Sequence, residues 1–406
     1  MSPILFRNRC FLLLMGGEII AGTGMWVAII GNLQFMQHLI ASDFLKSLVL
    51  TVGLAASVLL APNAGVIIDR YDKRNILVLS SLFRCFAPLS MFPALAFDSL
   101  AWMIVSLLVL QSANAYYLPT IQAAIPSVVS ADELLKANTI YLNIATLSRI
   151  GGTALGGIMV ATLSLWSLYL LALLAFLLLV VLSLLNRIPS TERAAAALPE
   201  QARFREVFSL IRADGSVLVG LFTSGVITIF LGGFNLLVLA FSELQQDPGL
   251  LGWIYTVEGT SILLGGLVAR RWTDRRRLLT TSTSLLFAFA LAYGGMSFAE
   301  QRVLVLASFA LFGFTVAFFF PLVTTIFQTR LPEDAHGRFF SLKGMLDRVG
   351  FQLALLITGA CLDLFGLAWY MLCLSLLTGL SGLLTLLYIR RKGWEQTLRD
   401  THSAAG

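Results

Sequence analysis

Long apolar segments recur along the whole chain, and short polar loops separate them. A helix that crosses a bilayer needs about 20 predominantly apolar residues. Twelve segments meet that length, so the pattern predicts an all-α polytopic membrane protein with twelve transmembrane helices. The predicted helices cover residues 9–37, 45–68, 75–96, 101–128, 135–160, 164–187, 215–242, 249–271, 277–298, 302–329, 338–362 and 366–390.

The longest connection divides these segments into two sets of six. Part of this connection, residues 203–212, has apolar side chains on one helical face and is predicted to be an amphipathic helix on the membrane surface. We expect an N-terminal six-helix bundle over residues 1–187, a cytoplasmic central loop over 188–214, a C-terminal six-helix bundle over 215–391 and a cytoplasmic tail over 392–406.

Composition supports the membrane assignment. Hydrophobic residues make up 58% of the chain, charged residues make up 12%, and the mean hydropathy is +0.85. Soluble domains carry about 25% charged residues, so a soluble enzyme is excluded. Basic residues concentrate in every second loop, while the alternate loops hold only Lys46 and Arg302. The positive-inside rule therefore places both termini in the cytoplasm, and the net charge of +6 does not indicate a nucleic-acid partner.

Metal and cofactor chemistry has no pattern in this sequence. The four cysteines lie in or beside apolar segments and are interpreted as small buried hydrophobic residues. His38, His336 and His402 fall in loops or at helix ends, without ligand spacing. No phosphate-binding loop is present, so we expect no metal, no cofactor and no enzymatic activity.

A charged turn, GVIIDRYDKR from Gly65 to Arg74, separates the second and third apolar segments. Asp69 falls where a helix ends, so its carboxylate faces the negative end of the helix dipole and needs a cation or the start of another helix. Gly65 allows close approach of a neighbouring helix. We interpret residues 65–74 as a latch, meaning a cytoplasmic turn that docks on a neighbouring helix and can release it.

This turn resembles the signature loop between helices two and three of the major facilitator superfamily. Asp72 occupies a position where that signature usually has glycine, and the DRYDKR variant resembles the branch of macrolide-efflux proteins and the enterobactin exporter. The resemblance implies two six-helix bundles that transport by alternating access.

A weak internal repeat agrees with this plan. AGVIIDRYDKRN in the first half matches GGLVARRWTDRRR in the second, and Pro119 matches Pro321 in a further pair of segments. Parallel repeats of six helices are typical of these transporters. Asp69 matches Arg270, so we expect Asp69 to dock near Gly337 and Arg338. The predicted latch residues are Gly65, Asp69, Arg70, Lys73, Arg74, Gly337 and Arg338.

Seven charged residues fall inside the predicted spans, away from their ends: Glu18, Arg84, Arg149, Glu258, Lys343, Asp347 and Arg348. Each costs at least about 2.5 kcal/mol at mid-membrane, so each is a candidate functional residue. Lys343 and Asp347 are four residues apart and can neutralise each other, as an alternative to a role in coupling. The resemblance places Arg84 on a helix outside the central cavity, which favours a buried structural pair or a snorkelling side chain.

Glu18 and Glu258 lie near mid-membrane, where burial favours the neutral form of a carboxylate and makes reversible protonation feasible. The alternative for each is a permanently paired structural acid. The resemblance makes Arg149 a candidate counter-ion for one of them. Gln111 replaces the arginine that antiporters of this superfamily commonly carry in helix four, and the fifth segment lacks their Gly-Pro pair. The predicted proton-coupling residues are Glu18, Arg149, Glu258 and Asp347.

The substrate cavity is expected between the halves at the midplane. Aromatic and amide side chains on the first, fourth, seventh and tenth segments favour a bulky amphipathic ligand. The candidates are Trp26, Asn32, Gln34, Gln111, Asn114, Tyr116, Gln122, Phe230, Phe234, Asn235, Phe318 and Gln328.

By resemblance, the expected function is secondary active export of amphipathic small molecules, such as drugs or macrolides, by proton antiport in a bacterial cytoplasmic membrane. The expected partners are the substrate, protons and the bilayer, and the expected state is a monomer. One alternative is export of a siderophore or another endogenous metabolite, which the cation Arg149 would favour. A lysolipid flippase and a sensor or scaffold that does not transport are further alternatives.

Overall fold

The computed structural model describes residues 8–130, 133–189, 211–212, 214–272 and 278–392. Within these ranges every regular element is a helix, and twelve helices are long and apolar enough to cross a membrane. They are α1 (Arg9–Leu39), α2 (Asp43–Arg70), α3 (Lys73–Ala96), α4 (Leu100–Val128), α5 (Leu134–Thr162), α6 (Leu165–Leu185), α8 (Gly215–Leu244), α9 (Leu250–Trp272), α10 (Leu278–Met296), α11 (Arg302–Arg330), α12 (Glu333–Phe365) and α13 (Leu367–Lys392).

The twelve predicted spans are confirmed, and their ends fall within a few residues of the predicted ones. The largest difference is at α12, which begins at Glu333 directly after Pro332, whereas the apolar pattern starts only near residue 338. Charged residues at a helix start carry no apolar signal, so the sequence underestimates that end. Most of the predicted amphipathic helix at 203–212 lies outside the described residues.

Polar residues between the apolar segments start several helices. The side chains of Asn8, Ser42, Asp72 and Asp214 each accept a hydrogen bond from a backbone N–H two or three residues later, at 2.7–3.2 Å. Such N-caps satisfy donors that the first helical turn leaves unpaired. Asp72, at the position where the family signature has glycine, is thus the N-cap of α3.

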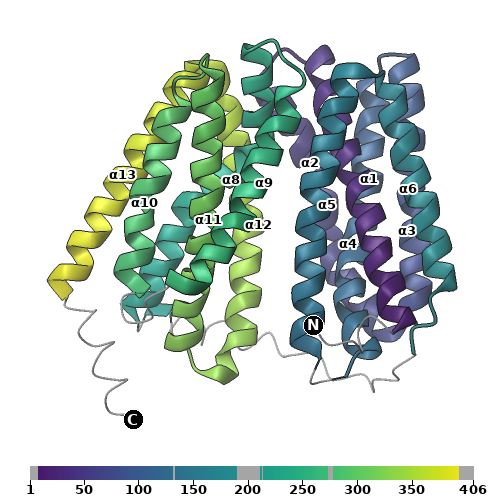
Figure 1. Cartoon of the computed structure of the whole chain (residues 1–406), viewed down its shortest axis with the longest axis horizontal. Coiled ribbons are helices and arrows are strands. Elements are labelled where there is room, and N and C mark those ends of the chain that lie inside the picture. Colours follow the sequence, from purple (N-terminus) through teal and green to yellow (C-terminus); the bar gives the residue numbers. More distant parts are fainter. Residues whose placement is uncertain (1–7, 131–132, 190–210, 213, 273–277, 393–406) are drawn as a thin grey trace. The chain divides into compact units, whose positions relative to one another are not determined.

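Unit 1 comprises Met1–Leu198 together with Gln246–Thr256. In this unit α1 packs against α5 and α6, α3 packs against α4 and α6, and α2 packs against α4 (Figure 1). More than half of the most apolar stretch of α1 is buried. This central position explains how α1 holds polar side chains away from lipid.

Glycines bring α5 close to its neighbours within unit 1. A Cβ added at Gly152 would lie 2.8 Å from Cβ of Trp26, and one at Gly156 would lie 3.0 Å from Cβ of Ile30. A Cβ added at Gly252 on α9 would lie 2.8 Å from Cα of Gly157. Small residues at these positions therefore allow α5 to pack closely against its neighbours.

Unit 2 comprises Pro199–Gln245 and Val257–Gly406. Here α10 packs against α11 and α13, and α8 packs against α12. Aromatic rings fill the core. Phe230 is fully buried and its ring centroid lies 4.6 Å from that of Tyr293 and 4.5 Å from that of Phe312.

Candidate functional site

Unit 1 buries a cluster of charged and polar side chains that converge from four helices. The exposed fraction is 6% for Glu18 on α1, 2% for Arg84 on α3, 2% for Tyr117 on α4 and 7% for Tyr141 on α5. Apolar residues of α1, α3, α4 and α6 surround Tyr117 and Tyr141 in one core cluster of this unit. Water is therefore largely excluded, and charges interact more strongly than they would in solvent.

Arg84 is held by contacts with α4 and α6. Its Nη2 atom donates a hydrogen bond to Oδ1 of Asn114. Its guanidinium carbon lies 3.8 Å from the ring centroid of Tyr117 and 5.8 Å from that of Phe176. Cation–π contacts of this kind stabilise a desolvated cation by about 2 kcal/mol. These contacts identify Arg84 as a buried charge inside the bundle and exclude a snorkelling side chain.

Glu18 interacts with both Tyr117 and Arg84. The Tyr117 hydroxyl is within hydrogen-bonding reach of the Glu18 carboxylate, and the positive charge that acts on Glu18 is that of Arg84. Tyr117 thus touches the cation with its ring and the acid with its hydroxyl. The Oε2 atom of Glu18 is buried and finds no hydrogen-bond donor among the described residues. A carboxylate with one unsatisfied buried oxygen is a group that a proton would stabilise.

The sequence identified Glu18 but not its partner. Arg84, for which the sequence favoured a buried structural pair or a snorkelling side chain, lies close enough to Glu18 for its charge to act on the carboxylate. Arg149 lies near Trp26 instead, with its guanidinium carbon 6.0 Å from a Trp26 ring centroid. The role of Arg149 as a counter-ion for one of the two buried glutamates stays a prediction. Tyr117 was missed, although a tyrosine in the middle of an apolar helix requires a hydrogen-bond partner and is a usable signal.

Trp26 and Arg149 form a second polar contact in unit 1, further along α1 and α5. The Trp26 ring centroid lies 6.1 Å from that of Tyr255, which belongs to the same unit. Trp26 is partly exposed, as a substrate-contacting side chain would be. Its contact with substrate remains a prediction.

The remaining cavity candidates of unit 1 have varied surroundings. Asn32 is buried and accepts a hydrogen bond of 2.9 Å from the Tyr169 hydroxyl, while Gln34 is buried with its Oε1 atom unpaired within the described ranges. Gln111 and Tyr116 are partly buried on α4, where Tyr116 packs beside Ile68 and Ile76. Tyr169 was also missed by the sequence analysis.

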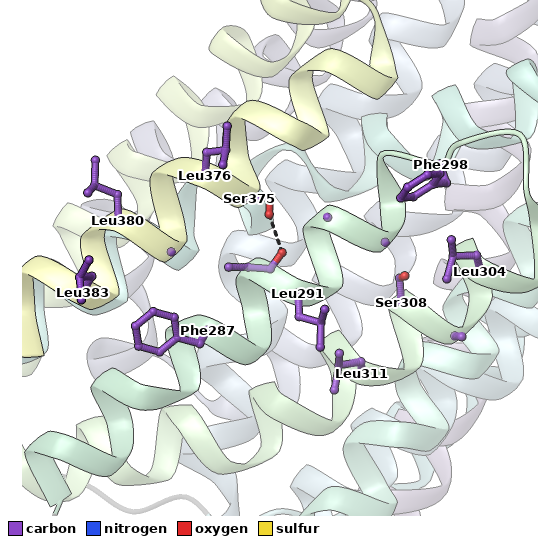
Figure 2. Close-up of a pocket in the computed structure, with 15 residues that line it drawn as sticks. Phe287, Leu291, Phe298, Leu304, Ser308, Leu311, Ser375, Leu376, Leu380 and Leu383 are labelled. Atoms are coloured by element: carbon purple, nitrogen blue, oxygen red, sulfur yellow. Dashed lines mark hydrogen bonds between the residues drawn. The ribbon is translucent and has the colours of Figure 1, made fainter.

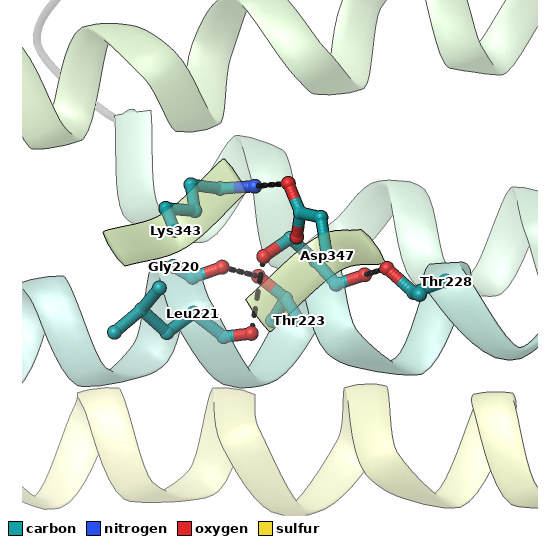
Figure 3. Close-up of polar contacts among 7 residues, drawn as sticks. Gly220, Leu221, Thr223, Thr228, Lys343 and Asp347 are labelled. Atoms are coloured by element: carbon teal, nitrogen blue, oxygen red, sulfur yellow. Dashed lines mark hydrogen bonds and ion pairs between the residues drawn. The ribbon is translucent and has the colours of Figure 1, made fainter. Parts of the chain in front are cut away.

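In unit 2 the predicted pair on α12 is confirmed. Nζ of Lys343 lies 2.6 Å from Oδ2 of Asp347. Figure 3 shows this pair above α8, whose Thr223 and Thr228 hydroxyls donate to backbone carbonyls one turn earlier. Asp347 is therefore largely neutralised by its neighbour, and its role in proton coupling stays a prediction.

The other candidates of unit 2 are placed as follows. Glu258 on α9 is 4% exposed, and its backbone packs against Gly313 on α11. Phe230 lies in the aromatic core, whereas Phe318 is partly buried with its ring centroid 5.1 Å from that of Phe314. Asn235 is partly buried on α8.

The latch turn links α2 and α3. Arg70 is the last residue of α2, and α3 begins at Lys73. The Lys73 ammonium donates to Ser127 Oγ at 3.2 Å, and Arg74 donates to the Leu184 carbonyl at 2.6 Å. Both bases therefore bind within unit 1. A Cβ at Gly65 would meet nothing within 4 Å. The side chains of Asp69 and Arg338 and the surroundings of Gly337 are outside what the structure describes.

Metal-binding chemistry finds no support in the described part of the chain. No three His, Cys, Asp or Glu side chains come together there in a group that could hold a metal ion. The buried cluster of unit 1 brings together a carboxylate, a guanidinium and two phenol groups, which are side chains that can bind or stabilise a proton.

Comparison with known proteins agrees with these features. The sequence profile of the Major Facilitator Superfamily matches residues 14–245 and 225–402. The chain is 27% identical over 402 residues to the uncharacterized MFS-type transporter YfiS of Bacillus subtilis (strain 168), covering 90% of this chain and 94% of that protein. It is 25% identical to the multidrug efflux pump Tap of Mycolicibacterium fortuitum, covering 90% and 92%. It is 20% identical to macrolide efflux protein A of Streptococcus pyogenes, covering 83% and 86%.

Solved structures show the same fold. The nucleoside transporter NupG superposes with a TM-score of 0.76 at 14% identity, over 94% of this chain and 99% of that chain. A bacterial homologue of the lysosomal transporter Spinster gives a TM-score of 0.73 at 13% identity, over 96% and 98%. The all-α, twelve-helix fold predicted from the sequence is thus confirmed.

Proposed function

Because the chain belongs to the Major Facilitator Superfamily and is a multi-pass bacterial membrane protein, we propose that it exports amphipathic small molecules in exchange for protons. Two relatives of low identity are an efflux pump and a macrolide efflux protein, which supports export and a macrolide-like or drug-like substrate. The proposed mechanism is alternating access of two six-helix bundles, carried out by a monomer.

The buried Glu18 carboxylate is the observation that carries this proposal. It lies on the central helix of unit 1, and one of its oxygens has no hydrogen-bond donor within the described ranges. A buried acid that is partly satisfied has two accessible states, one charged and one neutral. In the charged state, Arg84 and the Tyr117 hydroxyl stabilise it. In the neutral state, the added proton is carried by Oε2 of Glu18, the oxygen without a hydrogen-bond partner in the described ranges.

Charge balance links the proton to the conformation. With Glu18 ionised, the negative carboxylate compensates the buried Arg84 cation. Protonation of Glu18 leaves an uncompensated positive charge in a water-poor site, which is unfavourable unless the surroundings rearrange. Proton uptake from one side of the membrane and release to the other would then favour opposite orientations of the carrier.

The basic loops orient the proposed transporter. Lysines and arginines concentrate on the side that holds both termini, which supports a cytoplasmic location of the N- and C-termini. A proton that moves inward down 100 mV yields about 2.3 kcal/mol, enough for a substrate gradient of about 40-fold. One titrating carboxylate therefore supplies enough energy for useful export.

Drug-evoked proton release from the purified protein tests the proposal. Erythromycin and ethidium serve as probes, added to protein in weakly buffered detergent with a pH dye. We expect release from the wild type and loss of release in Glu18→Gln, because the amide cannot give up a proton. Glu300→Gln, at an exposed loop position, is the matched control and should release protons normally.

Glu258→Gln separates the two buried acids. If Glu258→Gln no longer releases protons while Glu18→Gln still does, the coupling acid lies in unit 2. The assignment of proton coupling to Glu18 would then be wrong. If every variant binds the probes but none releases protons, antiport itself is contradicted. Binding is followed in parallel by the quenching of intrinsic tryptophan fluorescence.

A further inference from the structure

A basic pocket lies in unit 1 between the first turns of α1 and α3 and the end of α6. Arg9 is in the first turn of α1, Arg74 is in the first turn of α3, and Arg187 follows α6 by two residues. All three line the pocket, and its volume of about 350 Å³ is within the range of small-ligand sites. None of the lining residues that the structure describes is acidic. We propose that this pocket binds a phosphate group.

Hydrogen bonds between helices build the frame of the pocket. Nη2 of Arg74 donates to the carbonyl of Leu184 at 2.6 Å, which joins α3 to α6. Nδ2 of Asn186 donates to the carbonyl of Cys10 at 3.2 Å, and Sγ of Cys10 donates to the carbonyl of Arg187 at 3.3 Å. The start of α1 is thereby joined to the end of α6. These contacts fix the backbone positions from which the three arginines line the pocket.

Arg74 has hydrogen-bonding capacity left for a ligand. One of its guanidinium nitrogens binds the Leu184 carbonyl, whereas its Nε atom is buried and has no partner within the described ranges. A buried donor without an acceptor is costly, and an oxygen of a bound anion would satisfy it. Guanidinium groups bind phosphate oxygens through paired N–H donors, which makes arginine well suited to this ligand.

The charges around the pocket favour an anion over a neutral ligand. An arginine in the first turn adds to the positive end of a helix dipole, and neither α1 nor α3 has an acidic residue in its first turn. Asp72, the N-cap of α3, accepts a hydrogen bond of 3.1 Å from the Arg74 backbone N–H, so its charge offsets at most one of the three cations. A phosphate monoester carries nearly two negative charges and three terminal oxygens, which match three guanidinium groups better than the two oxygens of a carboxylate do.

A wider hollow in unit 2, between α10, α11 and α13, shows the contrast (Figure 2). Its described lining consists of leucine, phenylalanine, alanine, glycine and serine, and the Ser375 hydroxyl already donates to the Ala290 carbonyl at 2.7 Å. That hollow therefore offers a ligand no charge. The assignment of a phosphate site in unit 1 rests on the arginines and their surroundings, because concavity alone does not select an anion.

A phosphate group can reach this pocket from two sources. Leu13, Leu184 and Leu185 also line it, and the last two are 49% and 52% exposed at the end of a membrane-spanning helix. The headgroup of a phospholipid can therefore enter beside the bilayer, and a free phosphate can enter from water. The binding chemistry is the same for both sources, so the experiment includes one probe for each.

Binding to the full chain in a non-ionic detergent at constant ionic strength tests the proposal. The probes are dioleoyl phosphatidic acid, dioleoylglycerol, which has the same chains without phosphate, and inorganic phosphate. Native mass spectrometry measures retained lipid, and the rise in unfolding temperature measures inorganic phosphate. We expect phosphatidic acid to bind about tenfold more tightly than dioleoylglycerol. Arg187→Gln should lose that tenfold, which corresponds to about 1.4 kcal/mol.

Arg390→Gln is the matched control, because it removes the same charge at an exposed position near the end of α13, outside the pocket. It should bind phosphatidic acid as the wild type does. Arg9→Gln removes a second arginine of the pocket and decides the question if Arg187→Gln does not fold. A rise in unfolding temperature with inorganic phosphate that is lost in the pocket variants would support the site with free phosphate as its source. Pocket-dependent retention of phosphatidic acid without that rise would support it with a lipid headgroup as the source.

Two results would overturn the proposal. Equal weakening in Arg187→Gln and Arg390→Gln would show a general attraction to basic side chains and no defined site. Equal binding of phosphatidic acid and dioleoylglycerol, without an effect of inorganic phosphate, would show that the phosphate group is not recognised. The residues around Glu18 do not line this pocket, so the outcome is independent of the proton-release test.

Discussion

Arg84 shows how a membrane bundle accommodates a fully buried cation. An arginine at mid-membrane is expensive, and here an amide oxygen, an aromatic face and a nearby carboxylate share its stabilisation. Its Nε atom is nevertheless buried without a hydrogen bond in the described part of the chain. A buried polar atom without a partner is costly, so this atom adds to the free energy needed to hold Arg84 in the core.

The two parts of Tyr117 make separable contributions to this cluster. Tyr117→Phe removes only the hydroxyl, and hydrogen bonds between membrane helices contribute about 0.6 kcal/mol on average. Tyr117→Leu also removes the ring below Arg84, a cation–π contact of about 2 kcal/mol in a desolvated site. We expect Tyr117→Leu to unfold at a clearly lower temperature than Tyr117→Phe, measured by thermal unfolding in detergent.

A second tyrosine provides the control. Tyr169→Phe removes a hydroxyl that binds Asn32 and leaves the Arg84 cluster intact. Its loss of stability should match that of Tyr117→Phe. Equal losses in Tyr117→Phe and Tyr117→Leu would contradict the contribution of the ring.

At the scale of helices, α5 depends on glycines whose surroundings differ sharply. Gly157 and Gly252 bring the backbones of α5 and α9 into contact, so neither position has room for a methyl group. Gly151 lies on the same helix, and a Cβ there would meet nothing within 4 Å. The sequence does not indicate which of these glycines have room for a side chain, and the structure does.

This contrast gives a matched pair of substitutions. Gly157→Val should push α5 and α9 apart and destabilise the fold by about 1–3 kcal/mol, the usual cost of overpacking. Gly151→Val, with the same side chain on the same helix, should leave the unfolding temperature nearly unchanged. Thermal unfolding of both variants, followed by size-exclusion fluorescence, checks the prediction. It fails if the two variants are equally stable.

Helix lengths and end points were predictable because apolar length and capping residues act locally. The Lys343–Asp347 pair was predictable from a spacing of four on one helix, whereas Asp72 was identified as the N-cap of α3 only in the structure. The Glu18–Tyr117–Arg84 cluster was not predictable, because its members lie on three helices and meet only through the rotation of those helices in the bundle.

At the scale of the whole molecule, the buried acids and the latch turn have different proposed roles. Glu18 lies within the core of unit 1, where proton binding changes a local charge. The turn from Gly65 to Arg74 joins α2 to α3, and Lys73 and Arg74 are bound within unit 1. Lys73 and Arg74 thus contribute to the stability of one unit, and Asp69 is the residue that we propose to control access.

Substitutions of two aspartates that are three residues apart distinguish a role in gating from a role in stability. Asp69→Asn removes the charge proposed to dock the latch, so we expect transport to be lost while the unfolding temperature is unchanged. Asp72→Ala removes the N-cap of α3, which should cost about 1 kcal/mol of stability and leave transport above half of normal. Erythromycin accumulation in cells, normalised to the amount of inserted protein, measures transport. Thermal unfolding measures stability. Full transport by Asp69→Asn would show that the carboxylate does not control access, and the resemblance of this turn to the family signature would then reflect helix connection alone.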